Sequence, residues 1–224
     1  MGKTSLVSSS QPRSIAVGDF NNDDFIDIVV ANSGSNTIGI FLSHDNGTFT
    51  DQNVYTTGFQ SSPYSVVTND FNNDNFIDIA VTNYRTNNVG IFFGHGNGTF
   101  STQISFSTGS SHPFFIKTGD FNNDNRSDIV IVNHGTNSIG VYIGYGNGSF
   151  QTEKRLFTGY DSVPYSMDVN DFNNDNNLDI VVVNYGTNNI GIFLGRGNGD
   201  FESQMIYSTN IHSNPTSVAV GDNS

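Results

Sequence analysis

The chain has 224 residues, only 13% of them charged, and its 8 basic and 21 acidic residues give a net charge of −13. This balance argues against a nucleic-acid partner, because no basic stripe is present that could neutralise phosphates. The absence of cysteine excludes disulfides, thiol nucleophiles and cysteine-based zinc sites. No apolar run approaches the roughly 20 residues of a membrane span, so no membrane insertion is expected.

A repeat of about 50 residues runs through the sequence. Five prolines mark it, at Pro12, Pro63, Pro113, Pro164 and Pro215, and an aspartate follows each of them at the same distance. A period in this range is typical of solenoids, propellers and arrays. We expect one repeat domain over residues 1–224, with repeats at approximately 13–63, 64–113, 114–164 and 165–215 and the start of a fifth at 216–224.

Each repeat is expected to contain four short strands. In the first repeat they cover residues 14–17, 26–31, 37–42 and about 49–56, where Val, Ile and Phe dominate, as is typical of half-buried strands. No segment sustains a 3.6-residue period, so essentially no helix is predicted. An Asn-Gly pair between the third and fourth strands, at 46–47, 97–98, 147–148 and 198–199, predicts a tight hairpin turn.

Four antiparallel strands per repeat predict an all-β fold, a β-propeller of four-stranded blades. One blade cannot cover both of its faces, so neighbouring blades must do so. Aromatic residues at one repeat position, such as Phe20 and Phe71, are interpreted as core between blades. Leu6-Val7 resembles the end of a further fourth strand, and residues 217–222 repeat the first strand, which predicts an extra terminal strand. Either the chain belongs to a longer array, or two chains form an eight-bladed ring as a homodimer.

The loop between the first and second strands carries the candidate chemistry. Side-chain oxygens fall at its positions 1, 3, 5 and 9, and position 7 would offer a backbone carbonyl. The predicted ligands are Asp19, Asn21, Asp23, Phe25 and Asp27; Asp70, Asn72, Asp74, Phe76 and Asp78; Asp120, Asn122, Asp124, Arg126 and Asp128; and Asp171, Asn173, Asp175, Asn177 and Asp179. Ca²⁺ takes six to eight oxygens in a flexible shell, which favours about four structural calcium ions. An Asx-rich turn without metal is the alternative.

Position 6 of each loop is expected to need a positive φ, which Asp and Asn tolerate better than most residues. Position 12 holds Val30, Val81, Ile131 or Val182 where a helix–loop–helix calcium site needs a bidentate Glu. The loop therefore belongs to a different, strand-flanked kind of site.

Aromatic and basic residues lie in loops at the opposite end of the blades. Tyr84, Arg85, His134 and Tyr185 are candidate ligand-binding residues, because such side chains stack on sugars and donate hydrogen bonds to them. Ordinary solvated loops are the other interpretation. No nucleophile elbow and no His-Glu zinc motif occurs, and the only glutamates are Glu153 and Glu202. The sequence therefore predicts that the chain is not an enzyme.

The stretch 91–100 reads Ile-Phe-Phe-Gly-His-Gly-Asn-Gly-Thr-Phe. Together with the aspartate loops it resembles FG-GAP/VCBS-type repeats, the calcium-binding blades of integrin α-subunit propellers and their relatives. No literal Gly-Ala-Pro follows, and the first copy has Ser43-His44-Asp45 where the others have Gly-x-Gly.

The resemblance implies a propeller with metal loops on one rim, extracellular or at the cell surface, that serves adhesion, carbohydrate binding or protein contact. We therefore expect a non-enzymatic, calcium-stabilised binding or adhesion module with a protein or carbohydrate ligand. The alternatives are a lectin whose sugar site lies at the loops opposite the metal, and a structural spacer from a longer array.

Overall fold

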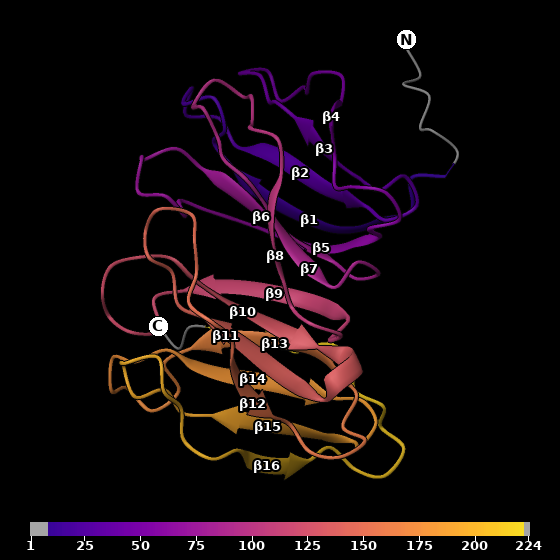
Figure 1. Cartoon of the computed structure of the whole chain (residues 1–224), viewed down its shortest axis with the longest axis vertical. Helices are drawn as coiled ribbons and strands as arrows, with labels where there is room; N and C mark the ends of the chain where they lie inside the picture. Colours follow the sequence, from indigo (N-terminus) through magenta and orange to yellow (C-terminus); the bar gives the residue numbers. More distant parts are fainter. Residues whose placement is uncertain (1–8, 222–224) are drawn as a thin grey trace. The chain divides into compact units, whose positions relative to one another are not determined.

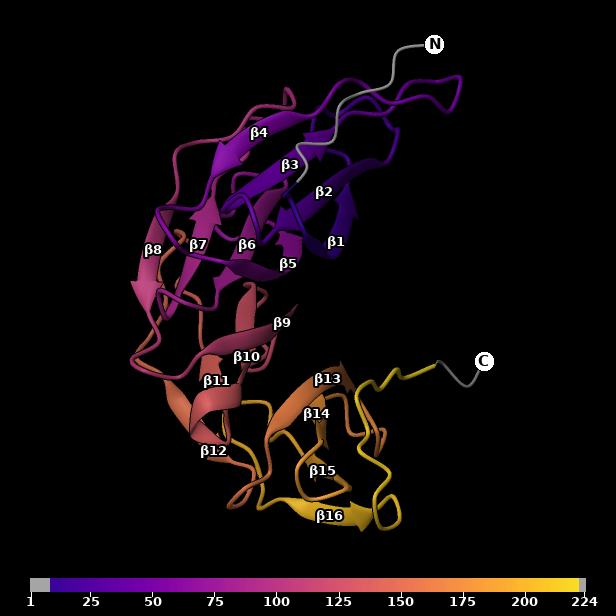
Figure 2. The same cartoon turned by 90° about the vertical axis from the view of Figure 1, so that its right-hand side faces the viewer.

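The computed structural model describes residues 9–221, which form an all-β structure of four antiparallel four-stranded sheets (Figures 1 and 2). The chain divides into two compact units, Met1–His112 and Pro113–Ser224, and each unit contributes two sheets. Within residues 9–221 no helix is long and apolar enough to cross a membrane.

The first unit contains the sheets of the first two repeats. The first sheet consists of β1 (Pro12–Gly18), β2 (Asp27–Asn32), β3 (Thr37–Phe41) and β4 (Asn53–Thr56). The second consists of β5 (Pro63–Asn69), β6 (Asp78–Asn83), β7 (Asn88–Phe92) and β8 (Ile104–Ser107). In both, every strand pairs antiparallel with the next strand along the chain, so each repeat makes one complete sheet.

The second unit repeats this order. Its sheets consist of β9 (Pro113–Gly119), β10 (Asp128–Asn133), β11 (Ser138–Tyr142) and β12 (Lys154–Phe157), and of β13 (Pro164–Asn170), β14 (Asp179–Asn184), β15 (Asn189–Phe193) and β16 (Met205–Ser208). A 3-10 turn, η1 (His134–Thr136), joins β10 to β11. Each first strand begins at its proline, where a missing N–H breaks no regular ladder bond, and the pairing is irregular at that point.

The connection between the third and fourth strands differs from the predicted tight hairpin. Of the Asn-Gly pair only the glycine has positive φ, for example 75° at Gly47. The Asn46 side chain accepts a hydrogen bond from Thr48 N at 3.0 Å and so forms an Asx turn. An isolated bridge between Ser43 and Phe49 precedes β4. The prediction of a tight two-residue hairpin turn is therefore wrong for these loops, because such a turn needs positive φ at both of its residues.

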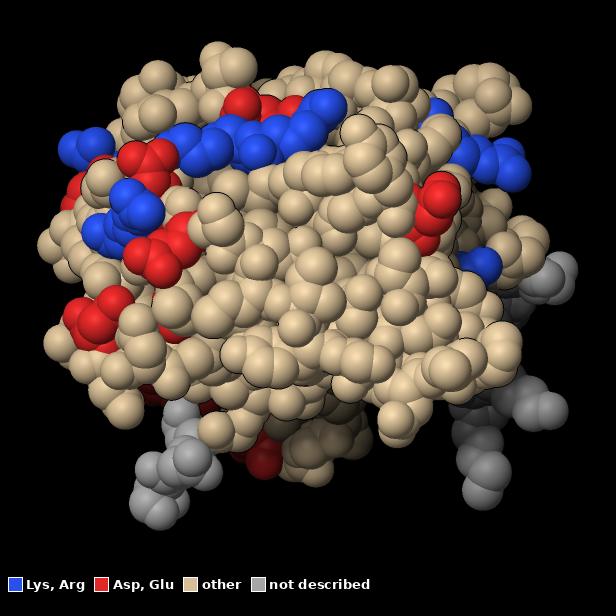
Figure 3. All heavy atoms as spheres, turned by 90° about the horizontal axis from the view of Figure 1, so that it is seen from below, with Lys and Arg blue, Asp and Glu red and all other residues tan. Residues whose placement is uncertain are grey.

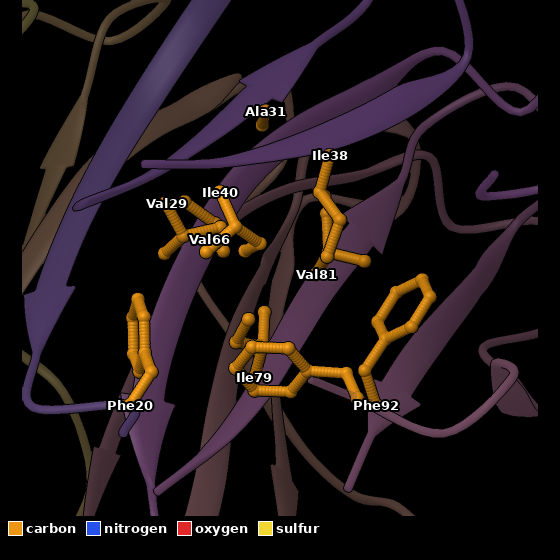
Figure 4. Close-up of a cluster of buried hydrophobic side chains, with 10 residues drawn as sticks. Phe20, Val29, Ala31, Ile38, Ile40, Val66, Ile79, Val81 and Phe92 are labelled. Atoms are coloured by element: carbon orange, nitrogen blue, oxygen red, sulfur yellow. The ribbon is translucent and has the colours of Figure 1, made fainter. Parts of the chain in front are cut away.

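Apolar side chains between neighbouring sheets form the core (Figure 4). In the first unit, the first sheet contributes Phe20, Val29, Ala31, Ile38 and Ile40, and the second contributes Val66, Ile79, Val81, Phe92 and Phe100. The Phe20 and Phe100 rings meet edge to face, with centroids 5.3 Å apart. Phe20 and Phe100 come from neighbouring sheets and pack against each other, which confirms for them the prediction that repeated aromatic residues lie between blades. One sheet alone would leave these rings in water.

The ends of the chain differ from the prediction of an extra terminal strand. Residues 216–221 form no strand, whereas Leu6-Val7 and residues 222–224 lie outside the described residues. Every first strand in the structure pairs with the second strand of its own repeat, whereas residues 216–221 take part in no such pair. They do lie beside β13, because Val220 N donates a hydrogen bond to Asp168 Oδ2 at 2.8 Å.

Candidate metal-binding loops

The loops that join first and second strands share one backbone conformation. In the loop between β1 and β2, the two carboxylate oxygens of Asp19 accept hydrogen bonds from Asp23 N (3.2 Å) and Asp24 N (2.9 Å). Asn21 Oδ1 also accepts from Asp23 N, and Asp23 Oδ1 accepts from Phe25 N. The same bonds recur in the other three loops. The side chains at positions 1, 3 and 5 therefore gather around the same few N–H groups.

Left-handed residues shape each loop. The expected positive φ at position 6 is found, at 69° for Asp24 and 62° to 66° for its three counterparts. Position 4 is also left-handed, with φ between 56° and 59° in all four loops, which the sequence analysis missed. The available signal was the asparagine that occupies position 4 in every copy, namely Asn22, Asn73, Asn123 and Asn174, since asparagine tolerates this region.

The aspartate at position 9 is buried and has a second, structural role as a hydrogen-bond acceptor for the backbone. Asp27, Asp78, Asp128 and Asp179 are all fully buried. In the second repeat, Asp78 Oδ2 accepts from Phe71 N at 2.9 Å and Oδ1 accepts from Gly94 N at 2.8 Å. Each of these carboxylates thus ties position 2 of its own loop to the end of the third strand. Sequence reasoning had assigned them a metal-binding role alone.

Burial and negative neighbours disfavour the ionised form of three of these aspartates, Asp78, Asp128 and Asp179. Burial is the largest effect on Asp78 and raises its pKa to about 6, while the N–H groups of Gly94 and Phe71 act in the opposite direction. The nearby carboxylates of Asp74 and Asp70 raise this pKa further. Asp128 has a pKa of about 6 for the same reasons, and that of Asp179 is also raised. Three carboxylates therefore repel one another in each of these loops.

The predicted ligand sets are brought together only loosely. Between residues 9 and 221, no three acidic or histidine side chains are arranged as a ready-made metal cage. The carboxylates at positions 1 and 5 turn instead towards the backbone N–H groups of their own loop. The third loop also holds a competing cation, because Arg126 Nη1 lies 3.7 Å from Asp124 Oδ2. All donors at positions 1, 3, 5 and 9 are oxygen atoms, which fits a hard cation such as Ca²⁺.

Aromatic pairs occupy the end of the sheets opposite the aspartate loops. In the first unit, Tyr84 stacks on His112 with ring centroids 5.0 Å apart, and Tyr64 lies 5.9 Å from Tyr84. Arg13 lies over the Tyr64 ring, 5.1 Å from its centroid. Arg85, by contrast, is held by its backbone, through a bond from Arg85 N to Ser61 O.

The second unit has a comparable arrangement. His134 stacks on Phe114 at 5.2 Å, and Tyr185 lies 6.0 Å from Tyr165. Tyr64, Phe114 and Tyr165 were missed as members of these clusters. Their shared signal is that each directly follows the proline that begins a first strand.

Comparison with solved structures shows the fold. Virginiamycin B lyase from Staphylococcus aureus matches with a TM-score of 0.63 and 20% identity, over 92% of this chain and 59% of that chain. A protein from Lactobacillus plantarum matches at 0.67 and 10%, over 92% and 58%. A lectin from Agrocybe aegerita, which recognises non-reducing terminal N-acetylglucosamine, matches at 0.61 and 18%, over 87% and 51%. The chain spans between half and three fifths of these β-propeller proteins.

This comparison corrects one prediction. The sequence predicted, from the lack of recognisable catalytic motifs, that the chain is not an enzyme. The comparison contradicts this prediction, because virginiamycin B lyase, which has the same fold, is an enzyme. At 20% identity the likeness extends to the fold alone.

Sequence comparison identifies the repeat. Among curated proteins, no sequence matches this chain. The pattern of the FG-GAP-like repeat matches it four times, at residues 19–81, 70–131, 120–182 and 171–223. These matches begin at the first aspartate of each loop and together cover most of the chain. The chain therefore belongs to the FG-GAP-like repeat family.

Proposed function

We propose that this FG-GAP-like β-propeller module is a calcium-stabilised binding or adhesion module. The observation that carries the proposal is the aspartate loop, which recurs four times with the same backbone turn and the same oxygen donors. Ordinary turns need one Asx side chain, whereas each of these loops carries aspartates at positions 1, 5 and 9, of which the one at position 9 is fully buried.

The residues that would hold the ion are the side chains at positions 1, 3, 5 and 9, with the carbonyl of position 7. In the second loop these are Asp70, Asn72, Asp74 and Asp78, with Phe76 as the backbone donor. A bound Ca²⁺ would supply the positive charge that three neighbouring carboxylates lack. It would thereby fix the loop between the first two strands, and four ions would offset much of the net charge of −13.

A thermal melt in calcium and in EDTA tests the metal. We expect a clear rise in melting temperature with Ca²⁺, since a ligand that binds only the folded state stabilises it by mass action. Mg²⁺ should do less, because it prefers a rigid octahedral shell with several waters. Equal melting temperatures in calcium and in EDTA would remove calcium from the proposal.

Carbohydrate binding at the opposite end is the second candidate function. The observation that favours it is the aromatic clustering around Tyr84 and Tyr185, because rings of this kind present apolar faces and polar edges to sugars. The Agrocybe aegerita lectin, which shares the fold, recognises terminal N-acetylglucosamine, and that sugar is the first probe to use. A glycan array in calcium tests this candidate, with the Tyr84→Ala, Tyr185→Ala double variant as the control. Loss of a signal only in the variant supports it, and no signal from folded protein contradicts it.

Placement outside the cell or at its surface follows from the same proposal. A flexible loop site with exposed carboxylates suits the higher calcium concentrations found there, at which extracellular modules bind the ion. Calcium affinity in the millimolar range would support this placement, and a nanomolar affinity would point to the cell interior.

A further inference from the structure

Basic side chains have different surroundings in the two units. Among the described residues, five Lys or Arg side chains form ion pairs with Asp or Glu, and all five belong to the second unit. Figure 3, which shows one face of the molecule, has basic and acidic side chains in the same areas. Arg13 and Arg85, the described Lys or Arg residues of the first unit, form no such pair within residues 9–221. The described part of the chain therefore leaves these two charges without a counter-ion.

The end of the first unit that holds these arginines carries no carboxylate. Every aspartate of residues 9–112 lies in an aspartate loop or in the connection between β3 and β4, and this stretch has no glutamate. Arg13 lies at the beginning of β1 and Arg85 in the connection between β6 and β7, both at the end opposite the aspartate loops. In a protein with a net charge of −13, an anion can thus approach this end without meeting a carboxylate of the first unit.

Both arginines depart from the pattern of the repeat. At the position of Arg85 the other three repeats have glycine, namely Gly34, Gly135 and Gly186. At the position of Arg13 the other three have an aromatic residue, namely Tyr64, Phe114 and Tyr165. The fold is therefore built without a cation at either position, and the packing of the blades does not account for the two charges.

The Arg13 guanidinium is held in place by uncharged neighbours. Its Nε donates a hydrogen bond to Ser33 Oγ at 3.4 Å, and its Cζ lies 5.1 Å from the centroid of the Tyr64 ring. Ser33 is buried, and its hydroxyl donates to Gln11 O at 3.0 Å. The Arg13 side chain itself is exposed. A guanidinium placed in this way can present its terminal N–H groups to the two oxygens of a carboxylate.

An aromatic cluster adjoins this guanidinium. The centroids of the Tyr64 and Tyr84 rings are 5.9 Å apart, and Tyr84 stacks on His112 at 5.0 Å. All three rings are partly exposed, and the exposed Arg85 directly follows Tyr84. Aromatic rings with polar edges offer both an apolar surface and hydrogen bonds to a sugar ring. The cluster therefore combines a surface for a pyranose with a cation for an acidic group.

We propose that this end of the first unit binds an acidic sugar, a pyranose that carries a carboxylate. Arg13 takes the carboxylate, Tyr64 and Tyr84 contact the sugar ring, and Arg85 adds positive charge beside them. The inference rests on the carbohydrate-binding function proposed above and names its substrate class. The second unit has Phe114 and Gly186 at the corresponding positions and should not share the preference for an acidic sugar.

Pairs of sugars that differ in the carboxylate test the substrate class. Saturation-transfer NMR titrations in calcium compare methyl galacturonide with methyl galactoside, and methyl glucuronide with methyl glucoside. We expect the acidic member of at least one pair to bind about fivefold more tightly, the upper end of what an exposed ion pair contributes. Sodium acetate supplies a carboxylate without a sugar ring and should not displace the acidic sugar at equal concentration.

Arginine variants test the site. The double variant Arg13→Gln, Arg85→Gln should bind both members of the pair equally, with the affinity that the wild type has for the neutral sugar. Arg13→Gln alone should lose most of the preference. Arg196→Gln is the matched control, because Arg196 is exposed in the connection between β15 and β16, and it should keep the preference. Circular dichroism should be the same for all variants, since the altered side chains are exposed.

The outcomes separate this inference from the function on which it rests. Equal binding of the acidic and neutral sugars by the wild type overturns the acidic-sugar site and leaves carbohydrate binding in place. No binding of any of these sugars to the folded protein overturns both. A preference that survives in the double variant, or a sugar that acetate displaces, overturns the site as well.

Discussion

Two aspartates of the same loop differ in their surroundings and therefore in their expected roles. Asp74 at position 5 is exposed, whereas Asp78 at position 9 is fully buried and accepts hydrogen bonds from Phe71 N and Gly94 N. Asp78→Ala would leave two buried N–H groups without an acceptor, at a cost of about 2–4 kcal/mol. Asp74→Ala should change stability by less than about 1 kcal/mol in EDTA and should reduce the stabilisation by calcium.

Urea unfolding of both variants, with EDTA and with calcium, measures the difference. If Asp78→Ala is as stable as the wild type in EDTA, the structural role of the buried carboxylate is wrong.

The third loop is expected to bind calcium more weakly than the others, because the Arg126 guanidinium lies 3.7 Å from Asp124 Oδ2. Arg126→Asn introduces the residue that the fourth loop has at this position, Asn177. It should raise the affinity of the third loop up to about fivefold, since exposed pairs of this kind contribute about 0.2–1 kcal/mol. Calorimetric titration with calcium measures it. Arg196→Asn, which removes an equal charge outside the aspartate loops, is the control and should have a smaller effect.

The buried aspartates predict an unusual pH dependence of the metal-free protein. Burial raises the pKa of Asp78 and of Asp128 to about 6, above the ordinary value of 3.8. Between these values the folded chain binds protons that the unfolded chain does not, so stability in EDTA should rise as the pH falls from 7 to 5. The pKa values of three other aspartates are lowered, so these groups take up protons only below this pH window; they are Asp168, Asp175 and Asp200.

Urea unfolding in EDTA at pH 7 and pH 5 measures the slope, and Asp78→Asn should flatten it. A metal-free protein that is less stable at pH 5 would contradict this assignment. In calcium the slope should reverse, because protons then compete with the ion.

At the scale of single elements, the sequence predicted most of the fold. Runs rich in Val, Ile and Phe placed the strands to within a few residues, and the prolines marked where each first strand lies, although each first strand begins at its proline and not after it. The hairpin turns were harder, because Asn-Gly permits several turns and the Asx bond of Asn46 to Thr48 N selects among them. The second role of Asp78 depends on Gly94, sixteen residues away along the chain, and no local pattern indicates that contact. Residues 217–221 have the sequence pattern of a first strand, but the structure shows no strand there.

Glycines at the end of the third strand are expected to be essential for the geometry of the loop. A Cβ at Gly94 would lie 2.2 Å from the carbonyl oxygen of Ile77, which is backbone and cannot move independently. Gly94→Ala should therefore cost about 2–3 kcal/mol. Gly90→Ala is the matched control, because its Cβ would meet the end of the Gln103 side chain, which can rotate away. Chemical unfolding should show the smaller loss for Gly90→Ala, and equal losses would contradict the steric argument.

At the scale of the whole molecule, the negative charge and the aspartate loops predict how stability responds to salt. With a net charge of −13, the metal-free chain repels itself, and NaCl should raise its melting temperature by screening. The calcium-loaded protein should respond less, because bound cations have already reduced the repulsion. Differential scanning calorimetry at low and high NaCl, with and without calcium, compares the two. A melting temperature that is independent of NaCl in EDTA would show that the charge is too dispersed to matter.

The order of strands within each sheet has a consequence for how the chain acquires its structure during synthesis. Every sheet pairs consecutive strands of a single repeat, so its contacts are close in sequence, which favours rapid folding. A repeat can therefore form its sheet soon after it leaves the ribosome, while its forward face still awaits the next repeat. Each pause in translation near a repeat boundary exposes an apolar surface of the kind that leads to aggregation, and the yield of soluble protein should depend on how quickly the following repeat appears.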